Sequence, residues 1–213
     1  EASMNVTLKE LIFGEQYCQG MKPGRTLKAV IPGGSSVPIL LPDQLDVQAS
    51  FDGVVKAGSM LGSAGAIVLD DTTCMVDAAY RFSRFLSIES CGQCPPCKLG
   101  SSAITEHLER LETGIGDDQD LSAIAGWLEH VTDGNRCFLA VEEQVMVSSI
   151  LRAFPDEFAE HIELHRCPRP RRLSIPKLVD LADGRAVYDE SFWRKRPDWT
   201  YDPETDAPDE AAR

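Results

Sequence analysis

Three cysteines stand at three-residue intervals in the stretch SIESCGQCPPCKLG, at Cys91, Cys94 and Cys97. Each CxxC loop is short enough to bring two sulfurs within bonding reach of one metal centre. Gly92 permits a tight turn, and Pro96 suits the first turn of a following helix. Thiolates at a helix N-terminus are stabilised by its partial positive charge. The stretch therefore predicts a metal centre with three of its ligands.

The spacing of these thiols favours an iron–sulfur centre. A repeated CxxC with a distant fourth cysteine is the common arrangement for a [4Fe–4S] cluster. Structural zinc more often uses two separated CxxC pairs, and a redox-active dithiol needs only one pair. We rank zinc second and a redox dithiol third.

Four further cysteines are candidates for the fourth ligand, and three of them are poorly placed. Cys74 precedes Cys91 across a predicted helix about 25 Å long at 1.5 Å per residue, so it points away. We interpret Cys74 as a small buried hydrophobic residue. Cys18 lies in another structural unit. Cys167 precedes Pro168 at the start of the tail and is interpreted as a spare thiol.

Cys137 is the remaining candidate, and it lies in DGNRCFLA between two predicted helices. In an up-down bundle, the chain that leaves Cys97 along one helix and returns along the next arrives back at the starting end. This topology selects Cys137 as the fourth ligand.

The composition limits the classes of partner. The chain of 213 residues carries a net charge of −13, which argues against a nucleic-acid surface. It contains no apolar run of about 18 residues, so no transmembrane helix is expected. Its seven cysteines are an odd number, and no export signal is visible. This pattern favours the reducing cytoplasm over a secreted disulfide scaffold.

The residues before the cysteines predict a small α+β unit over 1–73. Short apolar runs bounded by Gly, Pro and Ser are typical of strands. The sequence predicts helices over 7–13 and within 51–62, and strands over 27–34, 37–41 and 66–70.

A helical unit is predicted over 74–165 because apolar residues recur there at intervals of three and four. Its first helix covers 74–88. Its second follows the cysteines and ends at Gly114, and its third begins at Asp117 or Asp118 and runs past Val131. A fourth covers 138–153. Amphipathic helices with short links predict an antiparallel four-helix bundle. Residues 166–213 are expected to form an extended tail in which the aromatic side chains can still pack on the rest; these are Trp193, Trp199 and Tyr201.

These segments carry a resemblance to a known family. ESCGQCPPCKLG resembles the ESCGxCxPC[RK]xG motif of the flavin-containing, NADH-oxidising subunit of respiratory complex I and of related subunits in NAD-linked hydrogenases and formate dehydrogenases. LKAVIPGGSSVPIL and GSMLGSAGAIVLDDTTCMV resemble the family's ubiquitin-like β-grasp module, called SLBB. The resemblance covers about residues 5–165. It implies a β-grasp module, a four-helix iron–sulfur domain and a [4Fe–4S] cluster whose fourth cysteine follows the third by about 40 residues, as Cys137 follows Cys97.

The resemblance also implies partners. The cluster would take single electrons from a flavin reduced by NADH, but no GxGxxG or Walker pattern occurs here, and GIGDDQ lacks the third glycine. We therefore expect FMN and NADH to bind a domain upstream or on another chain, beside other electron-transfer subunits. The expected location is the cytoplasm, with any membrane contact at its inner face made through partners. GNRCFL departs from the family's usual Thr-x-Cys-Ala-like context. The competing interpretation is a non-catalytic interaction module stabilised by zinc or a cluster.

Other polar residues carry weaker indications. His161 and His165 are four apart but have no third ligand at a suitable spacing, so a solvated helix end is expected. Glu142 and Glu143 are adjacent, point in different directions and predict a polar helix face. Two residues beside the cysteines are more promising. Ser90 could donate a hydrogen bond to a cluster sulfur, and Lys98 could offset the cluster's negative charge.

Overall fold

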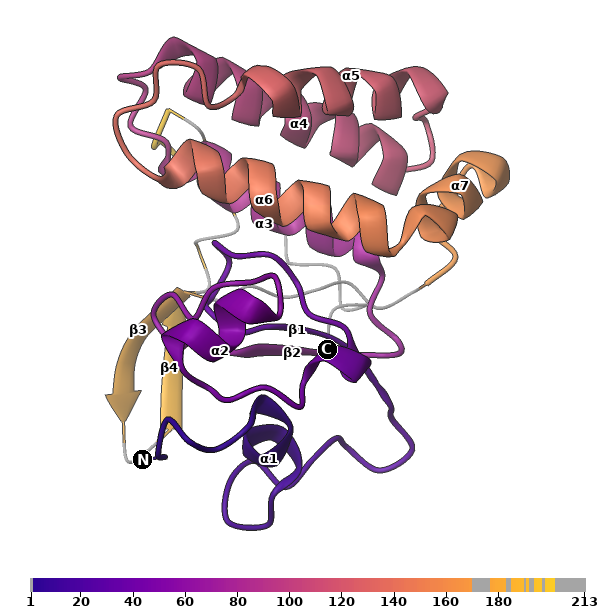
Figure 1. The fold of residues 1–213 in the computed structure, drawn as a ribbon. Helices are drawn as coiled ribbons and strands as arrows, with labels where there is room; N and C mark the ends of the chain where they lie inside the picture. Colours follow the sequence, from indigo (N-terminus) through magenta and orange to yellow (C-terminus); the bar gives the residue numbers. More distant parts are fainter. Residues whose placement is uncertain are drawn as a thin grey trace.

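The fold consists of a layer of long helices above a small unit of short helices and strands (Figure 1). The computed structural model describes residues 2–169, 177–182, 185–189, 191, 194–196 and 198–201. The upper layer contains α3 (Met75–Glu89), α4 (Pro95–Glu112), α5 (Asp118–His130) and α6 (Leu139–Ala153). The lower unit contains α1 (Leu8–Phe13), β1 (Leu27–Ile31), the 3-10 helix η1 (Pro42–Gln44), α2 (Phe51–Lys56) and β2 (Ile67–Asp70).

The strand β1 links the two layers through its alternating side chains. It pairs antiparallel with β2, with Val30 opposite Val68 and Ile31 opposite Ile67. Because successive strand residues point to opposite faces, Ala29 and Ile31 pack in the core of the long helices while Val30 packs against the short ones. One hydrophobic cluster therefore continues from the sheet into the helical layer.

The coarse α+β prediction is confirmed, but one strand is wrong. Residues 37–41 do not form a strand, and only Leu40 makes an isolated bridge to Val30. Pro38 lacks the N–H that a continuous ladder needs. Most other elements of this unit occur where they were expected: Thr7 caps α1 in a capping box with Glu10, and α2 lies within the predicted helical segment.

The helical unit contains one more helix than was predicted. The four expected helices are present, and Asp117 is the N-cap of α5. A fifth, α7 (Pro155–Leu164), follows α6 after a single residue. Pro155 occupies its first turn, where a missing N–H costs nothing, and Phe158 anchors it in the core. Within the described residues, the expected count of four helices over 74–165 is therefore too low.

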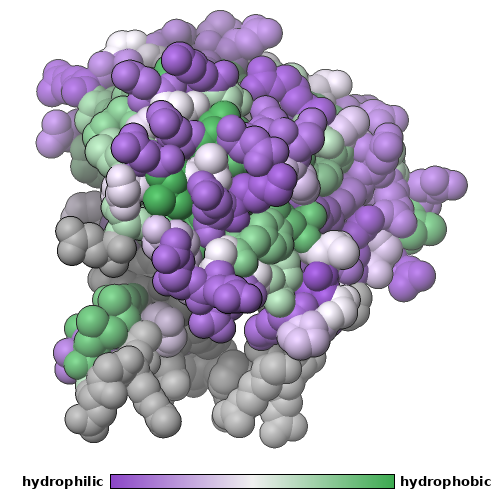
Figure 2. All heavy atoms as spheres, turned by 60° about the horizontal axis from the view of Figure 1, so that its bottom comes forward, coloured by the Kyte–Doolittle hydropathy of each residue, from purple (hydrophilic) through white to green (hydrophobic). Residues whose placement is uncertain are grey.

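The tail is not extended throughout. Its strands β3 (Lys177–Ala182) and β4 (Arg185–Asp189) form an antiparallel hairpin. The hairpin exposes hydrophobic side chains such as Leu178, Val179 and Leu181, whereas most of the face in Figure 2 is hydrophilic.

Further along, the tail returns to the end of α3. The Trp199 ring N–H donates to the Ile88 carbonyl at 2.7 Å, and Lys195 pairs with Glu89 at 2.7 Å. Trp199 thus contacts α3 although it is 55% exposed, while Trp193 lies outside the described residues. These contacts hold the tail beside the segment that leads into the first cysteine.

Candidate metal centre

The four predicted ligands lie at the ends of helices. Cys91 lies in the link between α3 and α4, Cys94 is the N-cap of α4, and Cys97 lies in the first turn of α4. Cys137 lies in the link between α5 and α6, just before the N-cap of α6. Gly92 has a φ of 76°, a left-handed conformation that suits glycine and turns the chain toward α4.

The electrostatics of Cys97 indicate that the thiols of Cys91, Cys94 and Cys137 lie near it. Burial raises the pKa of the Cys97 thiol, and a hydrogen bond with Ser90 lowers it. The neighbouring thiols of Cys137, Cys94 and Cys91 each raise this pKa further. Cys97 is buried, Cys94 is half-buried, and the other two are exposed. The helical hairpin therefore brings Cys137 back to the first three cysteines.

Two polar residues beside the thiols lie as the sequence suggested. The Ser90 hydroxyl is 3.5 Å from the Cys97 sulfur. The Lys98 ammonium donates to the backbone carbonyls of Ser87 at 2.9 Å and Ser90 at 3.1 Å. Burial lowers the pKa of Lys98, and the nearby thiols of Cys97 and Cys91 raise it. Lys98 thus satisfies backbone carbonyls at the C-terminal end of α3 and places positive charge beside the thiols.

A single zinc ion would hold its sulfur ligands close together. Zn–S bonds of about 2.3 Å at tetrahedral angles would hold sulfurs about 3.8 Å apart. Among the described residues, no three of these four thiols form a group whose sulfurs all lie within 4.8 Å of one another. Four cysteine thiols are the donor set of a polynuclear iron–sulfur centre.

A second group of ligand-type side chains was missed by the sequence reasoning. Cys74, Glu112, His161 and Cys167 present ligand atoms that all lie within 4.8 Å of one another. Cys74 is buried as expected, and burial raises the pKa of its thiol. The interpretation of His161 as solvated is wrong because its side chain is fully buried, whereas His165 is exposed. No sequence spacing indicates this group, because its members come from distant segments.

The helical unit belongs to a known class of iron–sulfur domain. Residues 77–161 match the family described as the NADH-ubiquinone oxidoreductase-F iron-sulfur binding region. This match includes all four predicted ligands and confirms the resemblance and the [4Fe–4S] cluster expected from it. Through this region the chain is similar to F-type subunits.

Longer relatives extend the similarity into the first unit. The chain is 41% identical over 168 residues to the F 2 subunit of NADH-quinone oxidoreductase from Rhizobium meliloti, covering 79% of this chain and 39% of the relative. It is 38% identical over 175 residues to the F subunit of the same enzyme from Mycobacterium bovis, covering 82% and 39%. The HndC subunit of the NADP-reducing hydrogenase from Solidesulfovibrio fructosivorans is 33% identical over 168 residues, with coverage of 79% and 34%. The chain thus spans less than half the length of the curated relatives it matches.

Solved structures share the fold. A crystal structure of an air-oxidized NAD+-reducing [NiFe]-hydrogenase has a TM-score of 0.62 at 24% identity and covers 75% of this chain and 26% of that one. The H2-reduced state gives a TM-score of 0.59, also at 24% identity, with coverage of 78% and 26%. Among the described residues, no helix combines the length and apolarity needed to cross a bilayer.

Proposed function

We propose that this chain is a one-electron relay module of an NADH-oxidising complex. The observation that carries this proposal is the gathering of four thiols inside the segment that matches the F-type iron–sulfur binding region. A [4Fe–4S] cluster supplies reversible one-electron transfer when it is bound. The protein's part is to hold that cluster at a fixed place and potential.

The proposed ligands are Cys91, Cys94, Cys97 and Cys137. Burial raises the pKa of Cys97, and the three neighbouring thiols raise it further, so four thiolates would repel one another without bound cations. Bound iron offsets this repulsion and keeps a coordinating thiol deprotonated. The donor set therefore fits a cationic cluster core.

The residues around the thiols would set the properties of the relay. The Ser90 hydroxyl lies 3.5 Å from the Cys97 sulfur, and it would donate to that sulfur when Cys97 is a thiolate ligand. Such a bond would reduce the negative charge on the ligand and raise the reduction potential. Lys98 acts in the same direction through its charge. The docked tail, held by Trp199 at Ile88, borders the same end of α3.

We also propose the wider setting that the resemblance implies. Residues 1–73 would be a β-grasp (SLBB) module, residues 74–165 the iron–sulfur domain and residues 166–213 a tail. FMN and NADH would bind a separate domain, upstream or on a partner chain, that donates electrons to the cluster. The complex would lie in the cytoplasm and touch the inner face of the membrane only through its other subunits.

A non-catalytic module stabilised by zinc or by a redox-silent cluster is the second candidate. Anaerobically prepared protein should be brown and contain about four irons per chain. Dithionite should bleach its visible absorbance and give a paramagnetic signal. A colourless protein with zinc at the four thiols, or a cluster that dithionite does not reduce, would contradict the relay.

The ligand assignment has its own test. Cys137→Ala should lose the iron and the visible absorbance, because the cluster loses a ligand on the returning hairpin. Cys18→Ala, which changes an exposed thiol in the first unit, is the matched control and should retain both. An intact cluster in Cys137→Ala would refute this choice of fourth ligand.

A further inference from the structure

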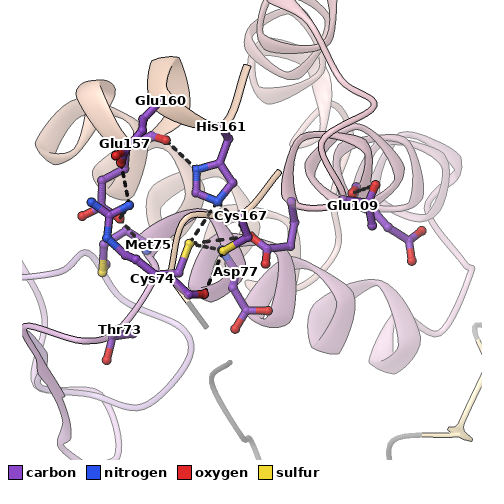
Figure 3. A network of polar contacts seen from close by, with 12 residues as sticks. Thr73, Cys74, Met75, Asp77, Glu109, Glu157, Glu160, His161 and Cys167 are labelled. Carbon is purple, nitrogen blue, oxygen red and sulfur yellow. Dashed lines mark hydrogen bonds and ion pairs between the residues drawn. The ribbon is translucent and has the colours of Figure 1, made fainter. Parts of the chain in front are cut away.

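Four ligand-type side chains converge at the end of α3 opposite the cysteine loop (Figure 3). Cys74 is the N-cap of α3, Glu112 is the last residue of α4, His161 lies on α7 and Cys167 follows α7. The first three are buried and Cys167 is half-buried. The 15 residues of α3 place this group about 22 Å from the cluster site.

The distances within this group match those around one tetrahedral ion. The His161 Nε2 atom is 3.3 Å from the Cys74 sulfur and 3.3 Å from Glu112 Oε2, and that sulfur is 3.6 Å from the same oxygen. Zinc bonds of about 2.3 Å to sulfur and about 2.0 Å to nitrogen and oxygen would give separations of about 3.5, 3.3 and 3.5 Å. Cys74, Glu112 and His161 therefore stand at coordination spacing, and the Cys167 sulfur lies within 4.8 Å of their ligand atoms.

Backbone contacts orient two of the ligands, His161 and Cys74. His161 Nδ1 is 2.7 Å from the Glu157 backbone carbonyl. A proton on Nδ1 satisfies that carbonyl and leaves the Nε2 lone pair facing the other three groups, as in metal-bound histidines. The backbone N–H of Asp77 donates to the Cys74 sulfur at 3.4 Å, and this bond would stabilise the thiolate of a metal-bound Cys74.

A hydrogen-bonded cluster without an ion is the competing interpretation. In that case a charged His161 would pair with Glu112, and two thiols would merely fill space. This interpretation also accounts for the hydrogen bonds that the Cys74 thiol donates to Glu112 at 3.6 Å and the Cys167 thiol to the Arg169 carbonyl at 3.1 Å. It does not explain why two thiols from distant segments meet the same imidazole and carboxylate. Cysteine sulfur, imidazole nitrogen and carboxylate oxygen are all ligands that zinc accepts.

We propose that Cys74, Glu112, His161 and Cys167 bind one Zn2+ ion as a structural site. Four protein ligands leave no open position for a substrate, so the ion would be structural and not catalytic. It would fasten the start of α3, the end of α4, helix α7 and the start of the tail to one another. The site is separate from the cluster and does not rest on the proposed relay function.

Metal analysis of matched variants tests this separation. The intact chain should contain about one zinc besides its iron. Cys167→Ser, which alters the half-buried ligand, should lose the zinc and keep the iron, and Cys137→Ala should do the reverse. Cys18→Ser should keep both metals. Zinc retained in Cys167→Ser, or absent from intact protein prepared with zinc, would overturn the proposal.

X-ray absorption at the zinc edge decides the matter on the unaltered protein, even where a variant fails to fold. Two sulfurs at about 2.3 Å and two nitrogen or oxygen ligands at about 2.0 Å would support the site. Four sulfur ligands would place zinc in the cysteine loop instead. A shell of oxygen and nitrogen alone would indicate an adventitious surface ion. Either of these last two results overturns the proposal.

Discussion

Glu143 shows how a single residue can depart from what its neighbours in sequence suggest. The sequence predicts a polar helix face at Glu142 and Glu143, but Glu143 is fully buried between α6 and α3. Ser83 donates to its Oε1 atom at 2.5 Å, while Oε2 has no hydrogen-bond partner among the described residues. Burial raises the pKa of this carboxyl to about 8, and Ser83 offsets only part of that shift. Glu143 is therefore neutral in the folded protein at neutral pH.

This buried carboxyl predicts a pH dependence of stability. Its pKa is about 8 when folded and near 4.5 when unfolded, so between these values only the folded state keeps the proton. The free energy of unfolding should fall with rising pH by about 1.4 kcal/mol per unit from this group. Glu143→Gln should remove that slope in denaturant unfolding at pH 5.5, 6.5 and 7.5. Glu106→Gln, at an exposed site on α4, should keep it. Equal slopes in both variants would show that Glu143 does not titrate in this range.

At the scale of elements, the close contact of α4 with the end of α5 positions the returning chain. Gly100 follows Cys97 by one helical turn, and a Cβ atom built there would lie 3.0 Å from the Val131 side chain and 3.3 Å from its Cα atom. Val131 caps the C-terminus of α5 and is fully buried, so it has little room to move. The link that carries Cys137 begins directly after it.

Gly100→Ala and Gly126→Ala form a matched pair on these two helices. Gly126 has open space around it, so its replacement should stabilise the protein by about 0.5–1 kcal/mol through helix propensity alone. At Gly100 the gain in helix propensity should be smaller than the destabilisation of about 1–3 kcal/mol that overpacking against Val131 causes. The iron content of this variant should also fall, because the shift of Val131 displaces Cys137. Chemical denaturation and iron analysis measure both effects. If the two variants gain stability equally, the close contact does not constrain the hairpin.

The elements also show what sequence reasoning can reach. The periodicity of α3 to α6 and the Asp117 cap follow from local rules, and these helices in turn bring Cys137 back to Cys97. The expected strand at 37–41 does not form because Pro38 breaks the ladder within an apolar run. The meeting of Cys74 with His161 could not be predicted, because α7 was not recognised and 87 residues separate the pair. The local sequence pattern therefore predicts the four-cysteine site, whereas the group at Cys74 can be found only from the tertiary structure.

At the scale of the molecule, the two proposed metal sites occupy opposite ends of α3 and have different roles, one in electron transfer and one in stability. The cysteine loop lies among exposed and half-buried thiols, where electrons can enter and leave. The group at Cys74 is buried beside the sheet and the start of the tail. We therefore expect loss of zinc to lower stability and loss of iron to abolish redox activity.

The last prediction concerns the electron donor. NADH gives up a hydride, which carries two electrons, whereas an iron–sulfur cluster accepts one electron at a time, so a flavin must stand between them. NADH alone should leave the visible absorbance of this chain unchanged, whereas dithionite should bleach it. Chemically reduced FMN should also reduce the cluster, because flavins can release electrons singly. Anaerobic spectroscopy with each reductant, and with Cys137→Ala as the cluster-free control, measures this directly. Bleaching by NADH without flavin would mean that the chain itself binds and oxidises the nucleotide. That result would contradict the proposal that the chain is only an electron relay.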